Sequence, residues 1–240
     1  MSHRKQQKQA LRREREERER KAREAQQRKR LVGYGAGGLL VLAVAIVLVV
    51  ALAGGSSSEG GDSKSGNLLP DGGSVPKQKA FQLDAAAKAA GCRLKSSKGS
   101  GVATHTTSLS ERVHYDTNPP TTGRHYQIPA DDGAYAGTPP QDEQLVHAEE
   151  HGRVIIWFQP TLPADQRADI KALFDEDSYQ MLVVQRRNMP YKIAASAWNR
   201  DPQPGGTGRL LLCSQVNENT WDALRAFRDE HRSNGPEAIP

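Results

Sequence analysis

The chain has only two cysteines, Cys92 and Cys213, among its 240 residues. They do not form a Cys-x-x-Cys pair, so the sequence lacks the redox motif of thioredoxin-like proteins. The sequence contains neither the Gly-x-x-x-x-Gly-Lys-Ser/Thr pattern of a phosphate-binding loop nor a Gly-x-Ser-x-Gly nucleophile turn. These absences exclude three common groups of enzymes: dithiol oxidoreductases, P-loop nucleotide hydrolases and hydrolases with a serine nucleophile of that type.

Residues 31–53 contain no charged side chain. As an α-helix this segment would extend roughly 34 Å, which is long enough to cross the hydrocarbon core of a bilayer. A cleaved signal peptide is the alternative, but the apolar run and the charged segment before it are both longer than the corresponding regions of a typical signal peptide. We therefore predict a single transmembrane helix over residues 31–53.

Positive charge is concentrated in front of this apolar run. Residues 1–30 contain 13 Lys and Arg against five Asp and Glu, whereas the rest of the chain contains 20 basic and 23 acidic residues. Basic segments remain on the cytoplasmic side, so residues 1–30 are predicted to form a cytoplasmic tail at the plasma membrane, with the C-terminal part outside. The tail is also suited to contact anionic lipid. Because the net charge of +5 arises from this tail, we expect no nucleic-acid binding.

Beyond the membrane segment the composition changes twice. Residues 54–79 are rich in Gly, Ser and Pro and are predicted to form a flexible tether. Residues 80–234 have the patterns of a globular domain, with helices expected at 83–92, 162–177 and 219–232 and strands at 154–158, 181–185, 191–198 and 209–213. They predict an α+β domain in which helices pack on one face of a small, mainly antiparallel sheet.

The two cysteines both lie in the part predicted to face outward. An oxidising compartment and an even count favour a disulfide between Cys92 and Cys213, with two buried thiols as the alternative. Such a bond would close a loop of about 120 residues and contribute about 4–5 kcal/mol in the chain-entropy description.

The segment LVHAEEHGRVIIWF, residues 145–158, carries the main candidate for chemistry. If its start is helical, His147 and His151 share one face, and two imidazoles so placed can bind one Zn or Cu ion. His125 and then His105 are the further ligands that we expect, with Glu149 and Glu150 orienting the rings or one of them binding directly. The alternative is a set of histidines that form ordinary hydrogen bonds beside a strand.

The same letters contain His-x-x-Glu-His, the zinc motif of inverted zincins, in which Glu150 would act as general base. Such enzymes need a long helix and a further acidic ligand. Here Gly152 and a strand follow at once, and Glu218 or Asp222 are the acids available downstream. A zinc-dependent hydrolase is therefore the lesser hypothesis, and the chain is expected not to be an enzyme.

A protein-interaction module is a third hypothesis. Residues 126–144 are predicted to form an irregular loop that contains Tyr126, Tyr135, several prolines and four acids. A loop of this kind can present a recognition surface, or can be an ordinary long loop packed by its own aromatic rings.

Several of these motifs follow one another in a fixed order: Ala-Gly-Cys at 90–92, His105, VHYDTNPPTTGRHY at 113–126 and LVHAEEHGRVIIWF at 145–158. In this order the chain resembles the bacterial domain of unknown function 3105 over most of residues 85–232. The resemblance implies an uncharacterised extracytoplasmic domain, often placed behind a single membrane anchor. The positions that match the family pattern are His105, Asn118, Pro119, Pro120, Gly123, His125, His147, Glu150 and His151.

Overall fold

The computed structural model describes residues 68–237. The predicted basic tail (1–30), transmembrane helix (31–53) and first part of the tether (54–67) lie outside the described residues. Within residues 68–237, no helix is both long and apolar enough to cross a membrane.

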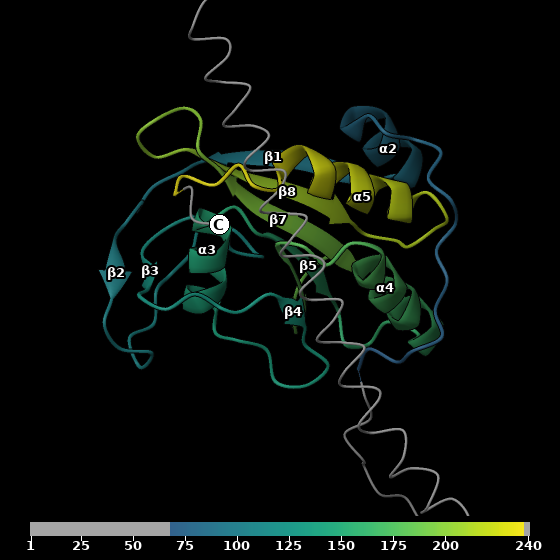
Figure 1. The fold of residues 1–240 in the computed structure, drawn as a ribbon, viewed down its shortest axis with the longest axis horizontal. Coiled ribbons are helices and arrows are strands. Elements are labelled where there is room, and N and C mark those ends of the chain that lie inside the picture. Colours follow the sequence, from purple (N-terminus) through teal and green to yellow (C-terminus); the bar gives the residue numbers. More distant parts are fainter. Residues whose placement is uncertain (1–67, 238–240) are drawn as a thin grey trace, which may run out of the picture. The chain divides into compact units, whose positions relative to one another are not determined.

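Four helices and eight strands make up residues 68–237 (Figure 1). The helices are α2 (Leu83–Ala90), α3 (Asp142–Glu150), α4 (Ala164–Glu176) and α5 (Thr220–His231). The strands are β1 (Arg93–Lys98), β2 (His105–Thr106), β3 (His125–Tyr126), β4 (Gly133–Ala134), β5 (Val154–Phe158), β6 (Met181–Gln185), β7 (Ile193–Asn199) and β8 (Thr207–Cys213). The predicted α+β class is confirmed.

Six of the strands form one sheet in the order β1-β8-β7-β5-β6-β4. Neighbouring strands are antiparallel from β1 to β5, and β5, β6 and β4 are parallel. The sheet is therefore mainly antiparallel, as predicted, with α4 connecting the parallel strands β5 and β6. Strands β2 and β3 form a separate parallel pair.

Helices cover both faces of the sheet, which corrects the prediction of helices on one face. Helices α2, α4 and α5 pack on the face that presents Ile156, Phe158 and Val183. Helix α3 packs on the opposite face, against Ile155 and Trp157 (Figure 1). Every residue of β5 is buried, because the strand lies in the middle of the sheet between these two layers. An uninterrupted apolar run is typical of a strand covered on both sides.

The segment 68–79 does not behave as part of a tether. Leu69 is 1% exposed and belongs to the core, and Arg167 of α4 donates a hydrogen bond to the carbonyl of Leu68. Gly73 lies so close to α4 that a Cβ atom there would come within 2.1 Å of the Ala168 backbone. The prediction of a flexible tether is therefore wrong for residues 68–79, which lie against the domain.

The predicted disulfide is confirmed. Cys92 and Cys213 are bonded, with their Cα atoms 4.4 Å apart and a sequence separation of 121. The bond joins the start of β1 to the end of β8, next to the register pair Arg93–Leu212. It therefore fixes the edge strand β1, which has a neighbour on one side only, to the sheet.

Candidate metal centre

Four side chains converge beside the C-terminal end of α3. The ligand atoms of His105, His125, His147 and Glu150 all lie within 4.8 Å of one another. Strands β2 and β3 place His105 directly opposite His125, and their ring centroids are 4.7 Å apart. Helix α3 supplies His147 and Glu150, three residues apart and hence on one face.

Two glycines allow the loops that carry these residues to cross. Gly101 and Gly123 both have positive φ, at 79° and 136°, a backbone conformation that glycine adopts readily. A Cβ atom on Gly101 would lie 2.5 Å from the backbone of Gly123, so no side chain fits there. This close approach brings the segment before β2 against the segment before β3. It thereby sets His105 and His125 side by side.

Backbone carbonyls fix the tautomers of two of the imidazoles. The Nδ1 of His125 lies 2.8 Å from the carbonyl oxygen of Gly123, and the Nδ1 of His147 lies 2.6 Å from that of Tyr126. A carbonyl accepts only, so each Nδ1 carries the proton and donates it. In the neutral rings, Nε2 is then the atom with the lone pair. Metal-binding histidines are usually oriented in the same way.

The buried pair His125 and Glu150 has an unusual geometry. The Nε2 of His125 lies 2.9 Å from Oε2 of Glu150, and both side chains are fully buried. Neither atom has a hydrogen-bond partner of acceptable geometry. The other oxygen of Glu150 accepts the backbone N–H of Ala103 at 2.6 Å. Two acceptor atoms cannot face each other in a buried position, so this arrangement requires a proton or a cation between Nε2 and Oε2.

The charge states of the group suit a cation. Burial lowers the pKa of His147 to about 4, against the opposing effect of the Tyr126 carbonyl, so the ring is neutral at pH 7. For Glu150, burial acts to raise the pKa, but the His125 ring, the Ala103 N–H and the His147 ring outweigh it and the pKa is lowered. His147 and Glu150 thus offer a neutral imidazole and a carboxylate, the protonation states in which these side chains bind metals.

His151 lies at the margin of this group. Its Nε2 is 3.0 Å from the Nε2 of His147, but its ligand atom groups with those of Glu150 and Glu237. The predicted ligands His105, His125 and His147 therefore come together, while His151 is replaced in the first group by Glu150. Glu237 was not predicted from the sequence, where nothing distinguishes it from other acids near the chain end.

Glu149 does not orient any of the imidazoles. Its carboxyl group accepts the hydroxyl of Ser196 on β7, which in turn accepts the indole N–H of Trp157. It is completely buried, and burial raises its pKa well above the usual range. Successive residues of a helix point in different directions, so Glu149 faces the sheet while Glu150 faces the histidines.

The described geometry can now be compared with known proteins. Residues 106–239 match the family described as protein of unknown function (DUF3105). The chain belongs to this family. The family resemblance predicted from the sequence is confirmed, and no curated protein or solved structure matches the chain. In this DUF3105 member the matched range contains every residue of both ligand groups except His105, which precedes it by one position.

The DUF3105 domain does not reproduce the expected arrangement of an inverted zincin. Helix α3 ends at Glu150, with His151 as its C-cap residue. Glu150, the predicted general base, is itself a ligand candidate in both groups. Glu218 and Asp222, the acids available as a further ligand, belong to neither group. Asp222 accepts the backbone N–H groups of Lys79 and Ala80 instead. In the first group Glu150 is the one carboxylate among residues 68–237, so no second carboxylate is left there to act as base.

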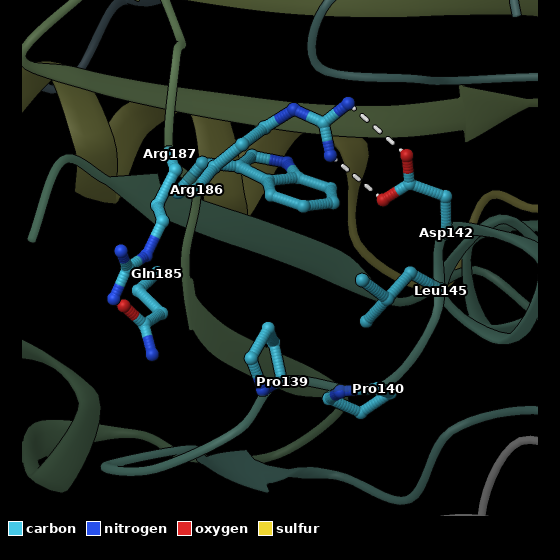
Figure 2. Close-up of a pocket in the computed structure, with 8 residues that line it drawn as sticks. Pro139, Pro140, Asp142, Leu145, Gln185, Arg186 and Arg187 are labelled. Atoms are coloured by element: carbon cyan, nitrogen blue, oxygen red, sulfur yellow. Dashed lines mark hydrogen bonds and ion pairs between the residues drawn. The ribbon is translucent and has the colours of Figure 1, made fainter.

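The loop of residues 126–144, predicted as a possible interaction surface, packs against the domain. The hydroxyl of Tyr135 donates to the carbonyl of Asp131, and its ring packs against the core below α3. An open cleft of about 330 Å³ lies beside the loop, at the N-terminal end of α3 (Figure 2). The two terminal nitrogens of the Arg186 guanidinium donate hydrogen bonds of 2.7 and 3.1 Å to the Asp142 carboxylate. Figure 2 shows this pair. This cleft is separate from the histidines, which lie towards the other end of the helix.

Proposed function

We propose that this domain binds a transition-metal ion through His105, His125, His147 and Glu150. The observation that carries the proposal is the contact between the Nε2 of His125 and the carboxylate of Glu150, two buried atoms 2.9 Å apart without a hydrogen bond of good geometry. An ion bound by both groups turns this unfavourable contact into two bonds. Ligand atoms of one ion at bond lengths of about 2 Å lie about 3 Å apart, which the observed distance matches.

The donor set favours Zn or Cu. Imidazole nitrogens suit borderline cations, and three neutral rings with one carboxylate leave a divalent ion only partly neutralised in a buried site. The exposure of His105 leaves one side of the site open to solvent, whereas His125, His147 and Glu150 are buried. An ion bound here would therefore be reached from the side of β2. This geometry supports binding of a metal and, by itself, does not call for a catalytic reaction.

The metal content of the purified protein tests this proposal. The full-length chain would be purified in detergent through an affinity tag without histidine, dialysed against mixed trace metals and analysed by mass spectrometry. We expect at least one equivalent of bound Zn or Cu in the wild type, and one equivalent less in a His125→Gln variant. His114→Gln is the matched control, because His114 is exposed and lies outside both groups. Equal metal content in the wild type and a folded His125→Gln variant would refute the proposal.

We also propose that the domain is held outside the plasma membrane by one transmembrane helix at residues 31–53, with the tail 1–30 in the cytoplasm near anionic lipid. The apolar run and the basic tail of the sequence support this placement. A disulfide is also most stable in an oxidising compartment, which supports the same side for Cys92 and Cys213. Digestion of the domain by a protease added to intact cells would support it, and full protection of an otherwise protease-sensitive domain would contradict it.

A further inference from the structure

The C-terminal segment lies in a fixed position against the end of α3. The N–H of Ser233 donates to the carbonyl of Gly152 at 2.8 Å, and the N–H of Glu237 donates to the carbonyl of Glu150 at 3.0 Å. A Cβ atom on Gly235 would lie 2.2 Å from that same Glu150 oxygen, so the two backbones are in direct contact. Glu237 is thus placed beside the proposed metal centre by backbone bonds rather than by its own side chain.

A second group of ligand atoms results from this contact. The ligand atoms of Glu150, His151 and Glu237 lie within 4.8 Å of one another, with 3.4 Å between Oε2 of Glu237 and Nε2 of His151. That distance is longer than a normal charge-assisted hydrogen bond. Glu150 is fully buried and its Oε2 has no hydrogen-bond partner of acceptable geometry, so a carboxylate with one unpartnered oxygen is common to both groups.

Two other potential metal-ligand atoms lie near the Nε2 of His151. It lies 3.0 Å from the Nε2 of His147 and 3.4 Å from the carboxylate of Glu237. If the lone pair of His147 Nε2 binds the first ion, this nitrogen can no longer accept a hydrogen bond from His151. The lone pair of a neutral His151 ring is then available for another cation, together with the oxygens of Glu150 and Glu237.

We propose that Glu150, His151 and Glu237 bind a second divalent transition-metal ion, with Glu150 bridging it to the first. This inference rests on the proposed function, because it shares Glu150 with the His105, His125 and His147 site. A carboxylate has two oxygens with about four lone-pair positions, which allows it to bridge two ions. Ions in such pairs lie about 3.5–4 Å apart. Glu237 is 29% exposed and His151 10%, so the second ion would lie nearer the surface than Glu150.

Zinc stoichiometry distinguishes the two sites. The full-length chain in detergent would be stripped of metal, loaded with Zn²⁺ and analysed after removal of the excess. We expect two equivalents in the wild type and one in Glu237→Gln, since Glu237 is absent from the first group. The exposed Glu230, on α5 and outside both groups, gives the control Glu230→Gln, which should retain two equivalents.

The outcomes separate this inference from the proposed function. One equivalent in the wild type, lost in His125→Gln and unchanged in Glu237→Gln, overturns the second site and leaves the first. Two equivalents retained in Glu237→Gln also overturn it, and no bound metal in any of the proteins overturns both proposals.

Loading with Cu²⁺ tests whether the two ions share a bridge. At about 3.5–4 Å the unpaired electrons of two copper ions couple, which reduces the electron paramagnetic resonance signal per bound copper. We expect a reduced signal in the wild type and a full signal per copper in Glu237→Gln. Two bound copper ions that each give a full signal would overturn the bridging role of Glu150.

Discussion

At the scale of single residues, the neighbouring glutamates Glu149 and Glu150 have opposite roles. Both are fully buried, but Glu150 lies among imidazoles and a backbone N–H that lower its pKa. Glu149 accepts a hydrogen bond from Ser196, and its second oxygen has no partner of acceptable geometry. Burial therefore keeps Glu149 protonated while its neighbour carries charge. One helix position decides which carboxyl group faces the histidines and which faces the sheet.

This difference predicts a pH effect on stability that depends on Glu149. Its pKa in the folded protein is raised well above the usual value of 4.5, so the folded state holds a proton that the unfolded chain releases. The contribution is complete below the unfolded pKa and is lost as pH rises, so the free energy of unfolding falls with increasing pH. Glu149→Gln, which mimics the protonated form, should be more stable than the wild type at about pH 8 and show a smaller decrease from about pH 4.5.

Urea denaturation of metal-stripped protein at several pH values checks this expectation. Wild type and Glu149→Gln are compared at each pH, so that the titration of the histidines contributes equally to both. Parallel curves for the two proteins would contradict a protonated Glu149.

At the scale of elements, the segment 68–79 contributes to the core although it is polar in sequence. Leu69 is buried beside α4, and the backbone of Lys79 and Ala80 is held by Asp222 of α5. Packing of a few residues therefore decides where the domain begins. Removal of the Leu69 side chain lowers the free energy of unfolding only if the segment is attached to the core.

Leu69→Ala should lower the free energy of unfolding by about 2–4 kcal/mol, because a buried leucine loses its contacts and leaves a cavity. Lys77→Ala, at an exposed position of the same segment, should change it by less than about 0.5 kcal/mol. Chemical denaturation of the two variants measures both values. Equal, small effects would mean that residues 68–79 form part of the tether after all.

At the scale of the whole molecule, the disulfide and the group of histidines lie on different sides of the sheet. Cys213 belongs to the core on the face of α2, α4 and α5, while α3 and its histidines lie on the other face. The bond closes a loop of 121 residues that contains most of the domain. Its effect should therefore be on global stability rather than on the ligand geometry.

A Cys92→Ala/Cys213→Ala variant is expected to lose about 4–5 kcal/mol of stability, the entropy of closing a loop of this length. Its metal content per folded molecule should equal that of the wild type. Thermal unfolding and mass spectrometry on the same preparation give the two values. A folded variant that loses its metal would show that the disulfide also positions the ligand groups.

Several elements of the fold were predictable from short stretches of sequence. Strands β5 and β6 have the predicted bounds, and α2, α4 and α5 begin and end within two residues of prediction. Their apolar residues and the glycine after α2 are local signals, so neighbouring residues suffice to read them. Strand β1, Arg-Leu-Lys-Ser-Ser-Lys, was not predicted, because its half-exposed, polar sequence becomes a strand only by pairing with β8.

The amino-acid sequence already indicates which side chains could bind a metal: the histidines of the two loops and the His-x-x-Glu-His segment. It also determined the disulfide partners, since no other cysteines exist. Glu150 and His151 follow His147 by three and four residues, and both positions lie near His147 on a helix. The choice of Glu150 for the first group therefore depends on the tertiary structure. The same holds for Glu237, which backbone hydrogen bonds bring beside His151 although the two residues are far apart in the sequence. Convergence of distant segments depends on sheet order and loop crossing, which local sequence patterns do not encode.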